Sequence, residues 1–204
     1  MTEIDDARAL RNVYKEPTDR AVRMQLDHLD LHCRRFIELS PFAAVARTGV
    51  DGRNDASPRG GPAGFVKVLG DNQLAFGDSP GKNRLDTLSN ITTHPQVGLL
   101  FMIPGVDETL HVNGTARSTT DAALREAMSI ERRAPASVMV VDVHEASLHC
   151  AKALMRSKLW DTESQIERAS LPTMSQMIKD QTKLAEMSVE NQETTQARLK
   201  EILY

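Results

Sequence analysis

The sequence is low in features that mark several classes of protein. Its 204 residues include two cysteines, too few for a disulfide framework, and lack the ~20 uninterrupted apolar residues of a membrane-spanning helix. With 25 basic and 28 acidic residues, no overall positive charge attracts nucleic acid. The acidic N-terminus MTEIDDARAL is not typical of a signal peptide. We therefore expect a cytoplasmic protein with neither nucleic acid nor membrane as partner.

Glycine is confined to one part of the chain. All 11 glycines lie between Gly49 and Gly114, which predicts a turn-rich middle flanked by helical ends. Apolar residues make up 40% and charged residues 26%, an ordinary balance for a folded protein. We therefore predict a helical segment over 1–40, a β domain over 41–160, and a helical tail over 161–204 that packs on its own domain or on a partner subunit.

Apolar spacing predicts the helices. A front helix is expected after Thr18 or Asp19, ending near residue 40, and short helices are expected over 82–91 and 121–130. Neither proline nor glycine follows Pro172, so we expect one long helix from there to about residue 203. The front helix has apolar residues three or four positions apart, which defines its buried face: Val22, Leu26, Leu29, Cys33, Phe36 and Ile37.

Short apolar runs between turns predict a mainly β fold with helical additions. Their hairpin spacing favours a six-stranded antiparallel barrel, closed or partly closed, over a sheet with long helical crossovers. Residues 51–64 are expected to form a long loop. The six expected strands cover 42–47, 65–69, 73–77, 96–103, 109–117 and 137–144.

Three cations indicate a phosphate site. Arg59 lies in a glycine-containing loop, and Lys82 and Arg84 lie where a strand ends and a helix is expected to begin. Exposed amides at a helix start favour phosphate, arginine adds a fork of donors and lysine a point charge. The alternative is an ordinary surface loop with scattered charges.

Metal binding is not predicted. His28 and His32 are four residues apart on the expected front helix, a spacing that suits two ligands of one metal. A third ligand with suitable spacing is missing from the sequence, and the neighbouring Cys33 lies on the apolar face, as a small buried residue does.

Three sequence segments resemble one family. They are Ser57-Pro-Arg-Gly60, Gly81-Lys-Asn-Arg-Leu-Asp86 and the stretch from His149-Cys150 to Trp160. Together with the order of the elements, they resemble the pyridoxamine 5′-phosphate oxidase-related FMN-binding proteins, over roughly residues 20–178. The resemblance implies a split-barrel fold and a homodimer with FMN at the subunit interface.

The resemblance also implies which residues contact FMN. Arg59, Lys82 and Arg84 would hold the phosphate, with Asn83 close by and Lys67 as a further basic candidate. The strand end at Phe76, Gly77 and Asp78 would lie along the flavin and meet it through backbone groups. Arg156, Ser157 and Trp160 would approach the cofactor from the second subunit, and Trp160 either packs on the ring or anchors the tail.

One departure from the family pattern concerns the substrate. Pyridoxamine-phosphate oxidases grip their substrate with a C-terminal segment in which Arg and His lie close together, whereas the last histidine here is His149. Vitamin B6 oxidase activity is therefore not expected. We expect an FMN-dependent oxidoreductase of unknown small-molecule substrate, with no catalytic side chain assigned. A non-catalytic flavin storage or sensing module and a haem-binding split barrel are the alternatives.

Overall fold

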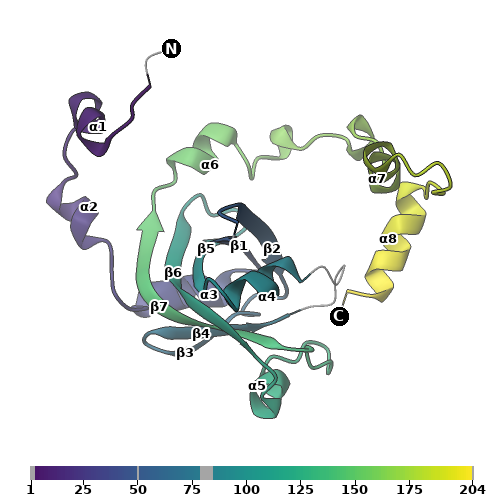
Figure 1. Ribbon diagram of the computed structural model, residues 1–204, viewed down its shortest axis with the longest axis horizontal. Helices are drawn as coiled ribbons and strands as arrows, with labels where there is room; N and C mark the ends of the chain where they lie inside the picture. Colours follow the sequence, from purple (N-terminus) through teal and green to yellow (C-terminus); the bar gives the residue numbers. More distant parts are fainter. Residues whose placement is uncertain (1–2, 50, 79–84, 204) are drawn as a thin grey trace.

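One antiparallel sheet organises the molecule (Figure 1). The computed structural model describes residues 3–49, 51–78 and 85–203. The described strands lie in the order β2-β1-β5-β6-β7-β4-β3. The expectation of a mainly antiparallel β fold with added helices is confirmed, with seven strands in the described residues instead of six. The strands are β1 (Phe42–Thr48), β2 (Asn54–Gly60), β3 (Lys67–Gly70), β4 (Gln73–Gly77), β5 (Gln96–Met102), β6 (Thr109–Thr119) and β7 (Val138–His149).

The additional strand is β2, in the segment that was expected to be a loop. It pairs antiparallel with β1 over its whole length, with Asn54 opposite Thr48 and Gly60 opposite Phe42. Pro58 is tolerated because β2 lies at the edge of the sheet, where one side of the strand needs no ladder partner. Exposed and half-buried residues alternate along β2, so polar side chains rather than apolar ones occupy its inner face.

The core lies between the curved sheet and the helix α3 (Leu31–Leu39). Burial alternates along β6, since Leu110, Val112, Gly114 and Ala116 are buried while the residues between them are only partly buried. A β-bulge occurs between Asn113 and Gly114, where a side chain on Gly114 would lie 2.1 Å from the Asp142 carbonyl oxygen. Glycine is therefore required at this close approach of β6 to β7.

The prediction of a single front helix is wrong. The structure has α1 (Ala7–Val13), α2 (Asp19–Arg23) and α3 (Leu31–Leu39) instead. Leu26 lies between α2 and α3 and exchanges two backbone hydrogen bonds with Ala146 of β7, at 2.9 and 2.8 Å. Asp30 then caps α3 by accepting from the Cys33 N–H at 2.8 Å. Of the predicted buried face, Leu29, Cys33 and Ile37 enter the core, whereas Val22 is 58% exposed.

The two short helices begin later than expected. They are α4 (Asp86–Ile91) and α5 (Ala122–Ala127). Leu85 has a φ of 58°, a left-handed conformation that a continuous right-handed helix excludes, so α4 begins at Asp86. Its Thr87 and Ile91 are buried against the rest of the fold.

The prediction of one long C-terminal helix is also wrong. The chain forms α6 (Lys152–Ser157), two 3₁₀ turns (Thr162–Ser164 and Arg168–Ser170), α7 (Met174–Thr182) and α8 (Gln192–Glu201). Lys183, with a φ of 55°, ends α7, and Asn191 caps α8 by accepting from the Thr194 N–H at 2.8 Å. Figure 1 shows this segment arching from α6 to α7 and α8, away from β6 and β7.

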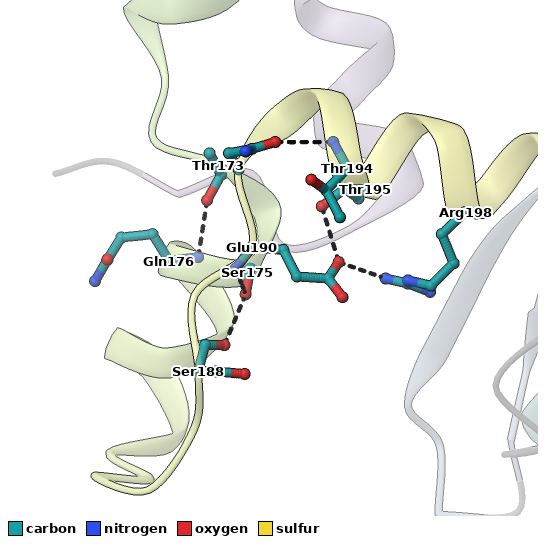
Figure 2. A network of polar contacts seen from close by, with 9 residues as sticks. Thr173, Ser175, Gln176, Ser188, Glu190, Thr194, Thr195 and Arg198 are labelled. Carbon is teal, nitrogen blue, oxygen red and sulfur yellow. Dashed lines mark hydrogen bonds and ion pairs between the residues drawn. The ribbon is translucent and has the colours of Figure 1, made fainter.

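A polar network joins α7 to the start of α8 (Figure 2). The Glu190 carboxylate accepts from Thr195 Oγ1 at 3.1 Å and from Arg198 Nη2 at 2.9 Å. Ser175 of α7 accepts from the Glu190 N–H at 3.1 Å and donates to the Ser188 carbonyl at 3.2 Å. These contacts replace the continuous helix. Within the described residues, every helix is too short or too polar to cross a membrane.

Candidate functional site

Three polar side chains line the inner face of β2. Asp55, Ser57 and Arg59 are spaced two residues apart, so they share one face of the strand, and all three are half-buried. The strand register places them opposite the buried residues of β1. Thr87 of α4 contacts this row, since its Oγ1 lies 3.1 Å from Ser57 Oγ. The edge strand β2 and helix α4 therefore meet at a polar site.

Arg59 has hydrogen-bonding capacity that the described residues do not use. Its Nη1 donates to Ser57 Oγ at 3.1 Å and to the Pro58 carbonyl at 2.9 Å. Its Nε is buried and has no acceptor among the described residues. A buried donor without an acceptor costs about 1–3 kcal/mol. The Arg59 guanidinium is therefore held on one side and lacks a partner on another, as expected of an anion-binding group.

Asp78 lies close enough to Arg59 for their charges to interact. Burial raises the pKa of the Asp78 carboxyl above its usual value, and the nearby Arg59 charge opposes this rise. The Asp78 N–H donates to the Ser137 carbonyl at 2.9 Å, which holds this residue at the end of β4. The fold thus brings together two of the predicted site residues, Arg59 from the edge strand β2 and Asp78 from the end of β4, which are far apart in the strand order.

Phe76 and Gly77 form the end of β4 next to Asp78. The Phe76 side chain is 1% exposed and belongs to the core, so only its backbone is available for a ligand. A side chain on Gly77 would lie 2.8 Å from Pro135 Cγ, so the chain approaches Pro135 closely here. Within the described residues, β3 pairs only with Gln73–Ala75, which leaves one backbone edge of Phe76 and Gly77 outside the ladder.

The remaining basic candidates differ in position. Lys67 is exposed at the start of β3 opposite Ala75, and therefore lies on the sheet face that α5 covers rather than on the core face. Lys82, Asn83 and Arg84 lie outside the described residues. Their predicted contacts with phosphate stay predictions.

The three remaining candidates lie on or just after α6, where the C-terminal arm (residues 152–203) begins. Arg156 and Ser157 are exposed, and Ser157 Oγ donates to the Leu154 carbonyl at 3.0 Å. Trp160 is half-buried, and its Nε1 donates to the Val106 carbonyl at 2.9 Å. Val106 belongs to the β5–β6 hairpin, so Trp160 anchors the arm at the end of the sheet where β2 finishes. Trp160 was predicted either to pack on the flavin ring or to anchor the tail, and its hydrogen bond to Val106 is a contact of the second kind.

Sequence reasoning missed four residues of this site. Arg47 has a fully buried side chain, and its Nη2 donates to Asp55 Oδ2 at 2.6 Å. Thr87 Oγ1 also donates to Asp55 Oδ2, at 3.3 Å. Asp55 and Ser57, four and two residues before Arg59, gave a signal, because polar residues at alternate positions indicate a polar strand face. The expectation of a loop over 51–64 concealed that signal.

A cavity of about 820 Å³ lies beside the ends of β1, β2 and β5. Small and polar residues that alternate with core residues line it, including Ala46, Gly98, His111 and Asn113. None of the predicted flavin-contact residues is part of this lining. The lining does include Arg47 and Asp55, so the cavity adjoins the Asp55 end of the polar site.

The paired histidines do not share a helix. His28 precedes α3, and its Nδ1 lies 2.8 Å from Asp27 Oδ1. Cys33 is 2% exposed, as its place on the apolar face predicted, and burial raises its pKa to about 12. In the part of the chain that the structure describes, no three His, Cys, Asp or Glu residues are grouped to hold a metal ion.

A protein-family model described as pyridoxamine 5′-phosphate oxidase matches residues 29–150, more than half of the chain. The chain belongs to this family. The match runs from the segment before α3 to the end of β7. Arg59, Thr87 and Asp78 therefore lie inside the family region, whereas Arg156 and Trp160 follow it.

Three solved structures are similar to part of the chain. HupZ from Group A Streptococcus is 17% identical, with 57% of this chain and 90% of that chain covered and a TM-score of 0.47. A pyridoxamine 5′-phosphate oxidase-related, FMN binding protein from Nostoc punctiforme is 14% identical, with 58% and 78% covered and a TM-score of 0.42. The FAD binding protein from Mycobacterium smegmatis is 19% identical, with 61% and 97% covered and a TM-score of 0.42. A search of curated proteins finds no match.

Proposed function

We propose that this protein binds FMN and that Arg59 holds the FMN phosphate. The observation that carries the proposal is the buried Arg59 Nε–H, which has no acceptor among the described residues. A phosphate oxygen is a strong acceptor, and the planar guanidinium matches phosphate geometry. The residues therefore fit the group, and membership of the pyridoxamine 5′-phosphate oxidase family supports the same ligand.

The strand end of β4 would meet the rest of the cofactor. The backbone edge of Phe76 and Gly77 lies outside the sheet ladder and adjoins Asp78, which interacts with Arg59. Backbone groups there can hydrogen-bond the polar edge of a flavin ring. FMN, when bound, supplies hydride-transfer chemistry, and this chain supplies position, a phosphate anchor and a positive charge.

A homodimer is the second part of the proposal. The cavity beside β1, β2 and β5 lies on a sheet face of small and polar residues, where Leu100 is 36% exposed. We infer that a second copy covers this face and that FMN lies at the interface. Arg156, Ser157 and Trp160 of the second copy would then approach the cofactor, as the family resemblance implies.

We infer that the bound FMN turns over as an oxidoreductase cofactor with a small-molecule substrate. The test is to add FMN to the purified protein, remove excess by gel filtration, and record the absorbance spectrum. The bound flavin is then mixed with NADH or NADPH without oxygen. Bleaching of the flavin band on a timescale of seconds supports an oxidoreductase, whereas bound flavin that no donor reduces indicates a storage or sensing module.

The binding step has its own control. Riboflavin has the same ring and ribityl chain but lacks the phosphate, so the ratio of the two affinities measures the phosphate site alone. We expect FMN to bind at least ~10-fold more tightly than riboflavin, because a charge-assisted contact is worth about 1.5–3 kcal/mol. A protein that binds neither flavin, or both equally, contradicts the proposal.

A further inference from the structure

Thr87 connects the two charged ends of the site. Its Oγ1 lies 3.1 Å from Ser57 Oγ and 3.3 Å from Asp55 Oδ2. Ser57 Oγ accepts from Arg59 Nη1 at 3.1 Å, and Asp55 Oδ2 accepts from Arg47 Nη2 at 2.6 Å. A continuous line of contacts therefore joins Arg59 to the buried Arg47, through one residue of α4 and two residues of β2.

The chemistry of these groups sets the direction of the hydrogen bonds. An ionised carboxylate only accepts, so the single hydroxyl proton of Thr87 is donated to Asp55. The Thr87 oxygen then accepts the Ser57 proton, and the Ser57 oxygen accepts from Arg59. Every donor thus points from Arg59 toward the Asp55 carboxylate. Hydrogen bonds in such a chain polarise and strengthen one another.

We propose that Thr87 and Ser57 are positioning residues for the Arg59 guanidinium. The inference rests on the proposed function, in which Arg59 binds the FMN phosphate. Because the guanidinium is planar, fixing Nη1 on Ser57 Oγ and on the Pro58 carbonyl also fixes the direction of the Nε–H. That N–H has no acceptor among the described residues and is thereby held ready for a phosphate oxygen.

Arg47 neutralises the Asp55 end of this hydrogen-bond chain, so that an anion can bind nearby. An unpaired Asp55 carboxylate would repel a phosphate across the site. The Arg47 side chain is fully buried and pairs with Asp55 at 2.6 Å, so the negative charge is compensated where it arises. Asp55 can then serve as the terminal acceptor for Thr87 with little net charge facing the ligand.

The test uses two variants of Thr87 in the full-length chain. Thr87→Val keeps the shape of the side chain but removes the hydroxyl, and Thr87→Ser keeps the hydroxyl as the matched control. FMN and riboflavin are titrated into each variant and into wild type. We expect Thr87→Val to weaken FMN binding roughly 3- to 10-fold and riboflavin binding by less than about twofold. Thr87→Ser should restore the wild-type ratio of the two affinities.

A second variant keeps the proposal testable if Thr87→Val does not fold. Ser57→Ala interrupts the same chain on β2 and should lower the FMN-to-riboflavin affinity ratio to a similar extent. If Arg59→Ala lowers this ratio but Thr87→Val or Ser57→Ala does not, the positioning role is wrong and the phosphate site stands. If wild type itself has no preference for FMN, the proposed function fails.

Discussion

Replacing Asp55 by asparagine leaves a fully buried guanidinium without the carboxylate that pairs with it. The Arg47 side chain is 0% exposed, and its Nε and Nη1 already lack acceptors among the described residues. Removing one partner of a buried ion pair costs about 3–5 kcal/mol, because the other charge stays buried. Asp55 is 33% exposed, so its own desolvation is partial and we place the cost of Asp55→Asn near the lower end, about 3 kcal/mol.

Replacing the other partner of the pair, Arg47, should lower the free energy of unfolding by less. Arg47→Met removes the buried charge together with its two unpartnered nitrogens, Nε and Nη1. It leaves a carboxylate that water reaches and to which Thr87 still donates. Replacing a buried ion pair by apolar groups is often neutral or better. Adding Arg47→Met to Asp55→Asn should therefore recover most of the lost stability.

Thermal and urea unfolding of the full chain measure these differences. A loss of about 3 kcal/mol lowers the Tm by roughly 6–12 °C in a chain of this size. Asp51→Asn is the control, because the Asp51–Arg53 pair is exposed and surface pairs contribute about 0–1 kcal/mol. If Asp55→Asn unfolds like wild type, or if Arg47→Met is the more damaging change, the buried-pair reasoning is refuted.

Three further predictions concern neighbouring residues. Arg59→Ala should weaken FMN binding roughly 10- to 150-fold and leave riboflavin binding almost unchanged in calorimetric titrations, whereas equal losses would contradict the assignment. Trp160→Phe removes the hydrogen bond to the Val106 carbonyl. Limited proteolysis should therefore cleave the C-terminal arm after residue 160 faster than in wild type. An unchanged cleavage rate would refute the anchoring role. Because burial raises the pKa of Asp78 in the folded state, this carboxyl is destabilising once ionised, and its cost disappears as pH falls through that raised pKa. Asp78→Asn should therefore be more stable than wild type at pH 7, by a margin that shrinks toward about pH 4, and a constant margin would argue against the shift.

Strands with apolar alternation were predictable from the sequence. In β6, Leu110, Val112 and Ala116 recur every second residue and are all buried, because one sheet face packs against the core. Strand β2 was not predictable in this way, because its inner face bears Asp55, Ser57 and Arg59. Ser57 and Asp55 contact Thr87, which lies 30 and 32 residues further along the chain, and hydrophobic periodicity does not reveal such contacts.

Helix ends were the least predictable part of the fold. The stripe from Val22 to Ile37 suits one helix, yet backbone pairing of Leu26 with Ala146 interrupts it. Likewise, the stretch after Pro172 contains no helix-breaking residue, but Lys183 adopts a left-handed conformation and Asn191 starts a new helix. Tertiary contacts and caps outweighed local propensity in both cases.

Part of the site was predictable because its residues are charged and close in sequence to glycine. Arg59 and Asp78 were both expected in the site, and the fold brings them within electrostatic reach. Thr87 and Arg47 were missed because a threonine on a short helix and an arginine on an inner strand face become functional candidates only once their partners are known.

The central claim is that Arg59 binds the phosphate of FMN. A crystal structure of the protein grown with FMN tests it most directly. We predict a phosphate oxygen about 3 Å from Arg59 Nε, with the Nη1 contact to Ser57 retained. FMN bound with its phosphate on other residues, while Arg59 Nε still has no acceptor, would contradict the account.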